Sequence, residues 1–378
     1  MHRIEVFQPQ TGVDSLKYLV NVFNSKWLWP GEKTEQLLKF FARLQSVEVD
    51  SLLPVSSCTD ALFIAAELLR DSDMYPRDEV IMPSVHFVGA ANAMTSIKYP
   101  IRFCDVDDRT LNPRVEHIER MYTRKAAAVI ILHYGGLPCD DIEEIVRFCK
   151  EKSLVLIEDS ACSMVSKKLG VPCGTFGDIG MWSFDPMKLI SCGDGGMMYI
   201  KNPRMMRVAR KLCHFGLTNK SGLSSQTEDR WWEFDVECAG RYSALTDVDS
   251  AILLTQFEQL NSFMIRRKMV DEYYRESLDG VGDTVLPPMI ADGDAHSYYF
   301  FWIQTDRRDD LAKFLRANDI YTTFRYYPLH HIPLYRQNGK NLPNTEKVQK
   351  NTLLLPMHAG LSIDDLDRVC TKVKEFYR

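Results

Sequence analysis

The sequence predicts an α/β protein, in which a large domain with a mostly parallel central sheet precedes a small α+β domain. The chain has 378 residues, more than a single hydrophobic core usually serves. From Ser51 onward, short apolar runs alternate with amphipathic stretches, as expected for parallel strands joined by helices. After Thr246 this alternation gives way to one long helical pattern and a shorter set of elements.

The first part of the chain is predicted to form two helices and then the sheet. Apolar residues recur at helical spacing over 14–23 and 34–44. Short apolar runs predict strands at 80–82, 101–104, 128–132, 154–157, 180–184 and 197–200. Helical segments such as 59–69 and 141–150 fall between these strands, so both faces of the sheet should be covered.

The second part is predicted to be a helical connection and a smaller domain. Apolar residues at 251, 254, 257, 260 and 263 predict a helix that continues, with a kink, to 274. A strand is expected at 298–305, a helix at 309–318 and a last helix at 363–377. The predicted domains are therefore 1–255, the large one, and 256–378, the small one.

Composition excludes several classes of protein. A net charge of -5 and a pI of about 6.0 do not favour a nucleic-acid-binding protein. Charges at Arg3, Glu5, Asp14 and Lys17 interrupt any signal peptide, and no apolar stretch predicts a membrane span. The 10 cysteines contain no CxxC pair. We therefore expect reduced thiols, no metal site, no membrane association and a cytoplasmic location.

Candidate functional residues follow the ends of the predicted strands, where ligands collect in open α/β sheets. Asp159 follows the strand at 154–157, and Lys188 follows Ser183 and the strand at 180–184. A glycine-rich turn at 193–196 comes next. Cys58 and Thr59 stand where a helix begins, and Phe87 follows the strand at 80–82.

These residue types answer the needs of a pyridinium cofactor such as pyridoxal phosphate (PLP). A carboxylate such as Asp159 keeps the ring nitrogen protonated, and a lysine such as Lys188 holds the cofactor as a Schiff base. Amides at a helix start, here near Cys58 and Thr59, suit the phosphate, and an aromatic face such as Phe87 suits the ring.

Each of these residues also has an ordinary structural interpretation. A lone lysine is usually a solvated surface charge, and Asp159 could cap the next helix. Thr59 is an ordinary helix cap, and Phe87 would normally lie in the core. The functional interpretation depends on their order and spacing, above all on Ser183-x-x-x-x-Lys188 followed by Gly193-Asp194-Gly195-Gly196.

From about Trp27 to about Asp367 the chain resembles the DegT/DnrJ/EryC1/StrS family of sugar aminotransferases, which have PLP fold type I. The segments that carry the resemblance are 57–62, 78–84, 133–136, 157–161, 174–178, 183–188, 327–330 and 355–356. The block that ends in Lys188, with its Gly-Asp-Gly-Gly turn, is the most specific of them.

The resemblance implies a role for each matching residue. Lys188 would bind PLP and shuttle protons, and Asp159 would pair with the pyridinium nitrogen. Ser183 and the amides near Cys58 and Thr59 would hold the phosphate, and Phe87 would stack on the ring. The family usually forms a homodimer with shared active sites. Residues expected near the partner's cofactor or the substrate are Tyr242, Trp27, Arg325, Tyr326 and His330.

Three positions depart from the family pattern. Cys162 stands where members usually have glutamine or histidine near the phenolic oxygen of the cofactor, and a neutral thiol is a poor hydrogen-bond partner. Tyr242, or Arg241 with a shift of one residue, stands where many members have asparagine. Arg325 replaces a frequent histidine.

The resemblance implies amino transfer from glutamate to a keto-sugar linked to a nucleotide, with C4 favoured over C3. One alternative is PLP-dependent sugar dehydration, but that branch replaces the lysine with histidine, and Lys188 argues against it. A PLP-binding regulator without catalysis is a second alternative, disfavoured by Lys188 and Asp159 together. An NAD-dependent sugar enzyme lacks support because no GxGxxG motif is present.

Overall fold

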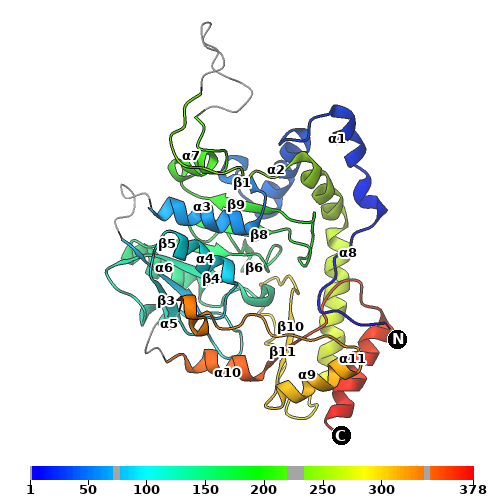
Figure 1. Cartoon of the computed structure of the whole chain (residues 1–378). Coiled ribbons are helices and arrows are strands. Elements are labelled where there is room, and N and C mark those ends of the chain that lie inside the picture. The colour runs from blue at the N-terminus through cyan, green and yellow to red at the C-terminus, as the bar shows by residue number, and fades with distance from the viewer. Residues whose placement is uncertain (1, 71–76, 219–233, 336–340) are drawn as a thin grey trace.

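The computed structural model describes residues 2–70, 77–218, 234–335 and 341–378. Its centre is a 7-stranded sheet in the order β1-β9-β8-β5-β4-β2-β3. Figure 1 shows helices packed around this sheet. The strands are β1 (Leu52–Val55), β2 (Glu79–Pro83), β3 (Ile101–Cys104), β4 (Ala126–Leu132), β5 (Val155–Asp159), β8 (Ile179–Ser183) and β9 (Gly196–Ile200). Neighbouring strands from β3 to β8 pair in parallel, and β9 is antiparallel to β8 and β1. The predicted α/β class with a mostly parallel sheet is confirmed.

Alternating side chains of the sheet face two helical layers. In β4, Ala128 and Ile130 pack in a core with α3 (Cys58–Arg70), α4 (Val88–Ser96) and α7 (Pro203–Leu212). Val129 and Ile131 pack on the other side with α5 (Val115–Glu119) and α6 (Ile142–Lys152). Both faces of these strands are buried, which explains why they are nearly continuous apolar runs in the sequence.

All six predicted strands of the sheet are present, and β1 is the strand that the prediction lacked. β1 contains Pro54, which argues against a central strand because proline cannot donate a ladder hydrogen bond. The strand lies at the edge of the sheet, where β9 is the one named strand that pairs with it in the part of the chain that the structure describes, so the proline is tolerated there.

The N-terminal helices differ slightly from the prediction. The helix expected at 14–23 is divided into a 3-10 turn, Val13–Leu16, and α1, Leu19–Ser25. The helix expected at 34–44 is α2, Glu32–Gln45. Asp247 fixes the start of α2, because its carboxylate accepts hydrogen bonds from the backbone amides of Gly31 and Thr34 at 2.8 and 2.9 Å.

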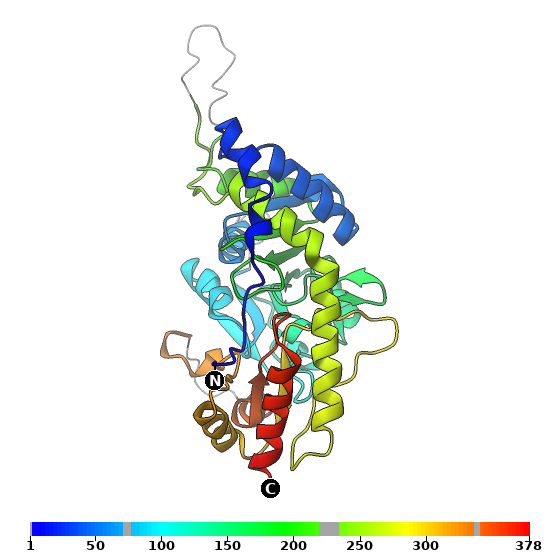
Figure 2. The ribbon, with the colours of Figure 1, turned by 90° about the vertical axis from the view of Figure 1, so that its right-hand side faces the viewer.

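The long helix predicted after Thr246 is α8, Asp247–Leu278, which begins with a capping box between Thr246 and Asp249. Its first half packs with α2, and its second half belongs to the core of the C-terminal elements. Figure 2 shows α11 beside the lower part of α8. α8 crosses residue 255 without interruption, so no break in the backbone marks the predicted boundary between domains 1–255 and 256–378. That boundary stays a prediction.

The C-terminal elements are β10 (Phe301–Gln304), α9 (Arg308–Ala317), the 3-10 turn η4 (Leu329–His331), α10 (Pro343–Asn351), β11 (Thr352–Leu355) and α11 (Ile363–Phe376). The predicted strand and both predicted helices are present. No disulfide joins any of the 10 cysteines, all of which lie in described segments. Within the described residues, no helix combines the length and hydrophobicity that a membrane span requires.

Candidate active site

The carboxyl ends of the parallel strands meet at one cavity. The register of the sheet pairs Leu132 of β4 with Asp159 of β5, and Asp159 with Met181 of β8. A cavity of about 430 Å³ lies at this edge of the sheet. Its walls are Cys58, Thr59, Leu62, Phe87, Leu132, Asp159, Ala161, Ser183, Asp185, Met187, Lys188, Asp194, Arg325 and Tyr326. Eight residues predicted from the sequence are among them: Cys58, Thr59, Phe87, Asp159, Ser183, Lys188, Arg325 and Tyr326.

Lys188 reaches the cavity from the segment that follows β8. Its Nζ lies 4.8 Å from the centre of the Tyr299 ring and 4.0 Å from the Cys162 Sγ. Burial alone would lower the pKa of the Lys188 amine, but the neighbouring Cys162, Tyr299 and Asp159 outweigh it and raise the pKa above its usual value. The amine is therefore a half-buried cation that attracts an anionic ligand.

Strand alternation places Asp159 and its neighbour Glu158 on opposite sides of β5. The Asp159 side chain lines the cavity, and its Oδ1 accepts a hydrogen bond of 3.0 Å from the amide of Ala161. Glu158 faces the core, where it accepts hydrogen bonds from the amides of Gly174 and Gly177 and lies 3.0 Å from His133 Nε2. Asp159 is thus the carboxylate available to a ligand, and Glu158 is a structural group.

The N-terminus of α3 forms another wall. Ser57 caps the helix, because its Oγ accepts a hydrogen bond of 3.0 Å from the Asp60 amide. The hydroxyls of Ser56 and Ser57 also donate to Asp60 Oδ2. The first amides of a helix have no acceptor within the helix, so those of Cys58 and Thr59 point toward an incoming anion.

The mouth of the cavity is aromatic and cationic. Phe87 is 43% exposed, and its ring centre lies 5.8 Å from that of Tyr326. The guanidinium carbon of Arg325 lies 4.4 Å from the centre of the Phe7 ring, and its Nη2 lies 3.1 Å from Met187 Sδ. These contacts hold a permanent positive charge at the mouth, beside the exposed ring of Phe87 and the half-buried ring of Tyr326.

Cys162 lies behind the cavity wall. Its Sγ is 3.8 Å from the Tyr326 hydroxyl as well as 4.0 Å from Lys188 Nζ. Burial raises the pKa of the Cys162 thiol, so the group is neutral near pH 7. Tyr326 therefore places a hydroxyl beside the position where a glutamine or histidine was expected.

Besides Cys162, three further residues of the predicted site do not line the cavity. Trp27 is 58% exposed and packs on Gly31. Tyr242 packs against Trp29, with ring centres 4.9 Å apart. His330 is bonded to Ser84 and Glu346 instead. Their roles toward the substrate or a partner's cofactor stay predictions.

The structure also brings two residues to the site that the sequence analysis did not assign. Tyr299 lies under Lys188, and its hydroxyl is buried without a hydrogen-bond partner among the described residues. His86 Nε2 lies 3.9 Å from Asp159 Oδ2, and burial lowers the pKa of this histidine despite the nearby carboxylate. The sequence offered one indication for His86, which is its position directly before the predicted site residue Phe87. No sequence pattern distinguishes Tyr299 from a core tyrosine.

The cavity meets the requirements of PLP on its own geometry. It combines the amine of Lys188, the buried carboxylate of Asp159 and the exposed ring of Phe87. The start of α3 and the Ser183 hydroxyl form the wall suited to the phosphate. A larger cavity of about 610 Å³, lined by residues such as Lys201, Arg207 and Arg210, contains none of the predicted residues.

Comparisons with known proteins agree with this arrangement. Residues 9–374 match the model of the DegT/DnrJ/EryC1/StrS aminotransferase family. The chain is 40% identical to the dTDP-4-dehydro-2,3,6-trideoxy-D-glucose 4-aminotransferase of Saccharopolyspora spinosa, over 99% of this chain and 96% of that protein. It is 30% identical to the GDP-perosamine synthase of Escherichia coli O157:H7, over 100% of this chain and 99% of that protein.

A solved structure is similar over almost the whole chain. The aminotransferase TlmJ from Streptoalloteichus hindustanus superposes with a TM-score of 0.92 at 40% identity, over 99% of this chain and 98% of TlmJ. The fold and the family resemblance inferred from the sequence are therefore both confirmed.

Proposed function

This chain belongs to the DegT/DnrJ/EryC1/StrS family of PLP-dependent aminotransferases, and we propose that it transfers an amino group from glutamate to the C4 ketone of a nucleotide-linked sugar. The observation that carries the proposal is the cavity in which Lys188 and Asp159 meet the N-terminus of α3, with Arg325 at the mouth. The relative from Saccharopolyspora spinosa, by its name a 4-aminotransferase for a dTDP-linked sugar, supports the choice of C4 and of a nucleotide carrier.

Each part of the cofactor has a matching group in the cavity. Lys188 would hold PLP covalently, and Asp159 would face the pyridinium nitrogen. The amides of Cys58 and Thr59, with the Ser183 hydroxyl, would bind the phosphate. Phe87 would cover the ring. When bound, PLP supplies an electron sink for the negative charge that develops at the carbon bearing the amino group.

The protein groups then control protons and charge. Lys188 Nζ is the one amine among the cavity-lining residues. In its neutral form it would take the proton from the substrate carbon and return it. An ionised Asp159 would favour protonation of the ring nitrogen, because opposite charges stabilise each other within a few ångströms. The Tyr326 hydroxyl, beside Cys162, would donate the hydrogen bond that glutamine or histidine makes in other members.

The mouth of the cavity suits an anionic and bulky acceptor. Guanidinium binds phosphate oxygens through two hydrogen bonds, and Arg325 is held at the mouth by its contacts with Phe7 and Met187. Phe87 and Tyr326 offer flat apolar faces to a sugar ring. We assign Arg325 as the polar contact to the nucleotide diphosphate.

We also propose a homodimer with shared active sites. Large apolar side chains of the N-terminal segment are exposed, including Val13 at 82%, Leu16 at 55%, Val20 at 60%, Phe23 at 60% and Trp27 at 58%. Exposed apolar residues that recur every three or four positions along one segment are typical of an interface. In the dimer Tyr242 would approach the partner's cofactor and Trp27 its substrate. Light scattering of the purified protein should give twice the mass of one chain, and a monomer that retains full activity would contradict shared sites.

The test of the reaction is an assay of the enzyme with PLP, glutamate and a panel of keto-sugars. The panel contains 4-keto and 3-keto sugars, each free and linked to a nucleotide. We expect 2-oxoglutarate to form with nucleotide-linked 4-ketones, and not with free sugars. Arg325→Ala should raise KM for the nucleotide sugar and leave the half-reaction with glutamate unchanged. Turnover of free sugars or simple keto acids, with none of nucleotide sugars, would overturn the proposal.

A further inference from the structure

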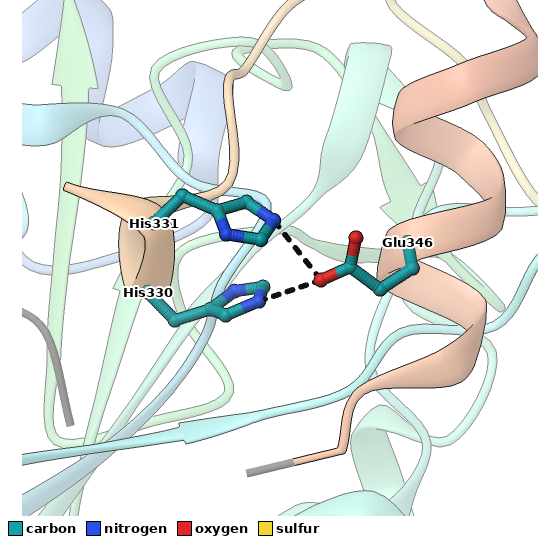
Figure 3. Close-up of side chains that lie close together, drawn as sticks. All are labelled: His330, His331 and Glu346. Carbon is teal, nitrogen blue, oxygen red and sulfur yellow. Dashed lines mark hydrogen bonds and ion pairs between the residues drawn. The ribbon is translucent and has the colours of Figure 1, made fainter. Parts of the chain in front are cut away.

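A cluster of three potential metal ligands lies next to the site but outside its walls. His330 and His331 of η4 and Glu346 of α10 converge as Figure 3 shows. Nε2 of each histidine lies 2.9 Å from the same oxygen of Glu346, Oε1, and the two ring centres are 4.1 Å apart. In the part of the chain that the structure describes, this is the one group of three such residues whose ligand atoms lie within 4.8 Å of one another.

The chemistry of the three ligands selects a class of ion. Two imidazole nitrogens and one carboxylate oxygen suit Zn²⁺ and other late first-row divalent ions, whereas Mg²⁺ and Ca²⁺ prefer oxygen ligands alone. Zn–N and Zn–O bonds of about 2.0–2.1 Å at tetrahedral angles place neighbouring ligand atoms about 3.3 Å apart. The nitrogen-to-oxygen distances of 2.9 Å are close to this separation, so small side-chain shifts would admit the ion.

The surroundings of the cluster also suit a metal. His330 Nδ1 lies 2.6 Å from Ser84 Oγ, and that hydroxyl also accepts a hydrogen bond from the His330 amide at 3.2 Å. A metal-binding histidine generally has its second ring nitrogen held in this way. The side chains of His331 and Glu346 are 33% and 37% exposed, which leaves a route for the ion and room for water ligands.

We propose that His330, His331 and Glu346 bind one Zn²⁺ or a similar late first-row divalent ion. No metal site was expected from the sequence, because the spacing of its cysteines fits none. The ion would hold η4 against α10 and, through Ser84, against the end of β2. The backbone supports this connection, because the Leu329 amide donates to the Ser84 carbonyl oxygen at 2.9 Å. The site would therefore stabilise the segment that carries Arg325 and Tyr326.

The experiment is a titration of the PLP-loaded enzyme, without a histidine tag and after treatment with a chelator, with ZnCl₂ in a calorimeter. We expect one high-affinity Zn²⁺ per chain. His331→Gln and Glu346→Gln should each weaken binding by about tenfold or more, since loss of even an outer partner of a ligand typically costs that much. Ser84→Ala tests that outer partner and should weaken binding by about tenfold.

The matched control is His2→Gln, which removes an exposed histidine remote from the cluster and should bind Zn²⁺ like the wild type. His331→Gln retains the bonds of His330 to Ser84 and Glu346, so this variant should fold, as circular dichroism and the cofactor spectrum will show. Zn²⁺ should raise the melting temperature of the wild type and of His2→Gln but not of Glu346→Gln. Absence of stoichiometric binding to the wild type would overturn the proposal. Wild-type affinity for Zn²⁺ in both His331→Gln and Glu346→Gln would overturn it too.

Discussion

Substitution of Gly196 by alanine tests how the start of α3 is positioned for the cofactor. An added Cβ would lie 2.7 Å from the Cys58 amide nitrogen and 2.8 Å from the Ser57 carbonyl carbon. Ordinary contacts begin near 3.4 Å, so β9 and α3 must separate by about 0.7 Å, the difference between 3.4 and 2.7 Å. β9 cannot easily retreat, because Gly196 pairs with Val55 on one side and Ser183 on the other. The first turn of α3 must move instead.

This movement should weaken cofactor binding. Overpacking of this kind typically costs about 1–3 kcal/mol, and each 1.4 kcal/mol is a tenfold change in a binding constant. Since the Cys58 amide is a proposed phosphate donor, we expect the Kd for PLP to rise about ten- to a hundredfold. Titration of the apoenzyme with PLP, followed by absorbance, measures this change. Gly12→Ala is the matched control, because an added Cβ there meets no atom within 4 Å. An unchanged Kd in a folded Gly196→Ala variant would refute the proposed phosphate site.

Three further predictions concern the cofactor site and the core. Asp159→Ala should retain some PLP but slow the half-reaction with glutamate about a hundredfold or more, the scale of losing one electrostatic partner at a catalytic centre. An unchanged rate in stopped flow would leave Asp159 only its structural hydrogen bond with the Ala161 amide. Cys162→Ala should reduce kcat less than about tenfold, because a thiol is a weak hydrogen-bond partner. Cys162→Gln should also remain active. Complete loss of activity in both variants would reveal chemistry at this thiol. Burial lowers the pKa of His296 to about 3 and of His358 to about 4, so below about pH 6.5 the unfolded chain takes up protons that the folded chain does not. The free energy of unfolding should be highest above that pH and fall by about 2 kcal/mol per histidine between pH 8 and 5 in urea titrations. A His358→Gln variant with the same pH dependence as the wild type would contradict this.

The parts of the fold that were predicted are those with strong local patterns. β4 is apolar on both faces, as is β5 up to Ile157, and α8 repeats apolar residues at helical spacing over many turns. β1 was not predicted. It has only four residues and contains Pro54, which is tolerated at the edge of a sheet, and a place at the edge is a long-range property.

The candidate site also contains residues that local patterns predict and residues that only long-range contacts bring there. Asp159 and Lys188 follow strand ends, and in a parallel sheet those ends meet at one edge, so order along the chain was enough to place them together. Tyr299 reaches Lys188 from a segment more than a hundred residues away, and no local pattern records that contact. The contact of Tyr326 with Cys162 is of the same kind.

The most direct test of the account is the covalent attachment of PLP to Lys188. The purified enzyme should absorb near the visible edge of the spectrum and lose this band on treatment with borohydride, which fixes the cofactor to its lysine. Peptide mapping should then find the pyridoxyl group on the peptide that contains Lys188, and Lys188→Ala should carry no label. A label on another lysine, or no label in a preparation that contains PLP, would contradict the assignment of this cavity as the active site.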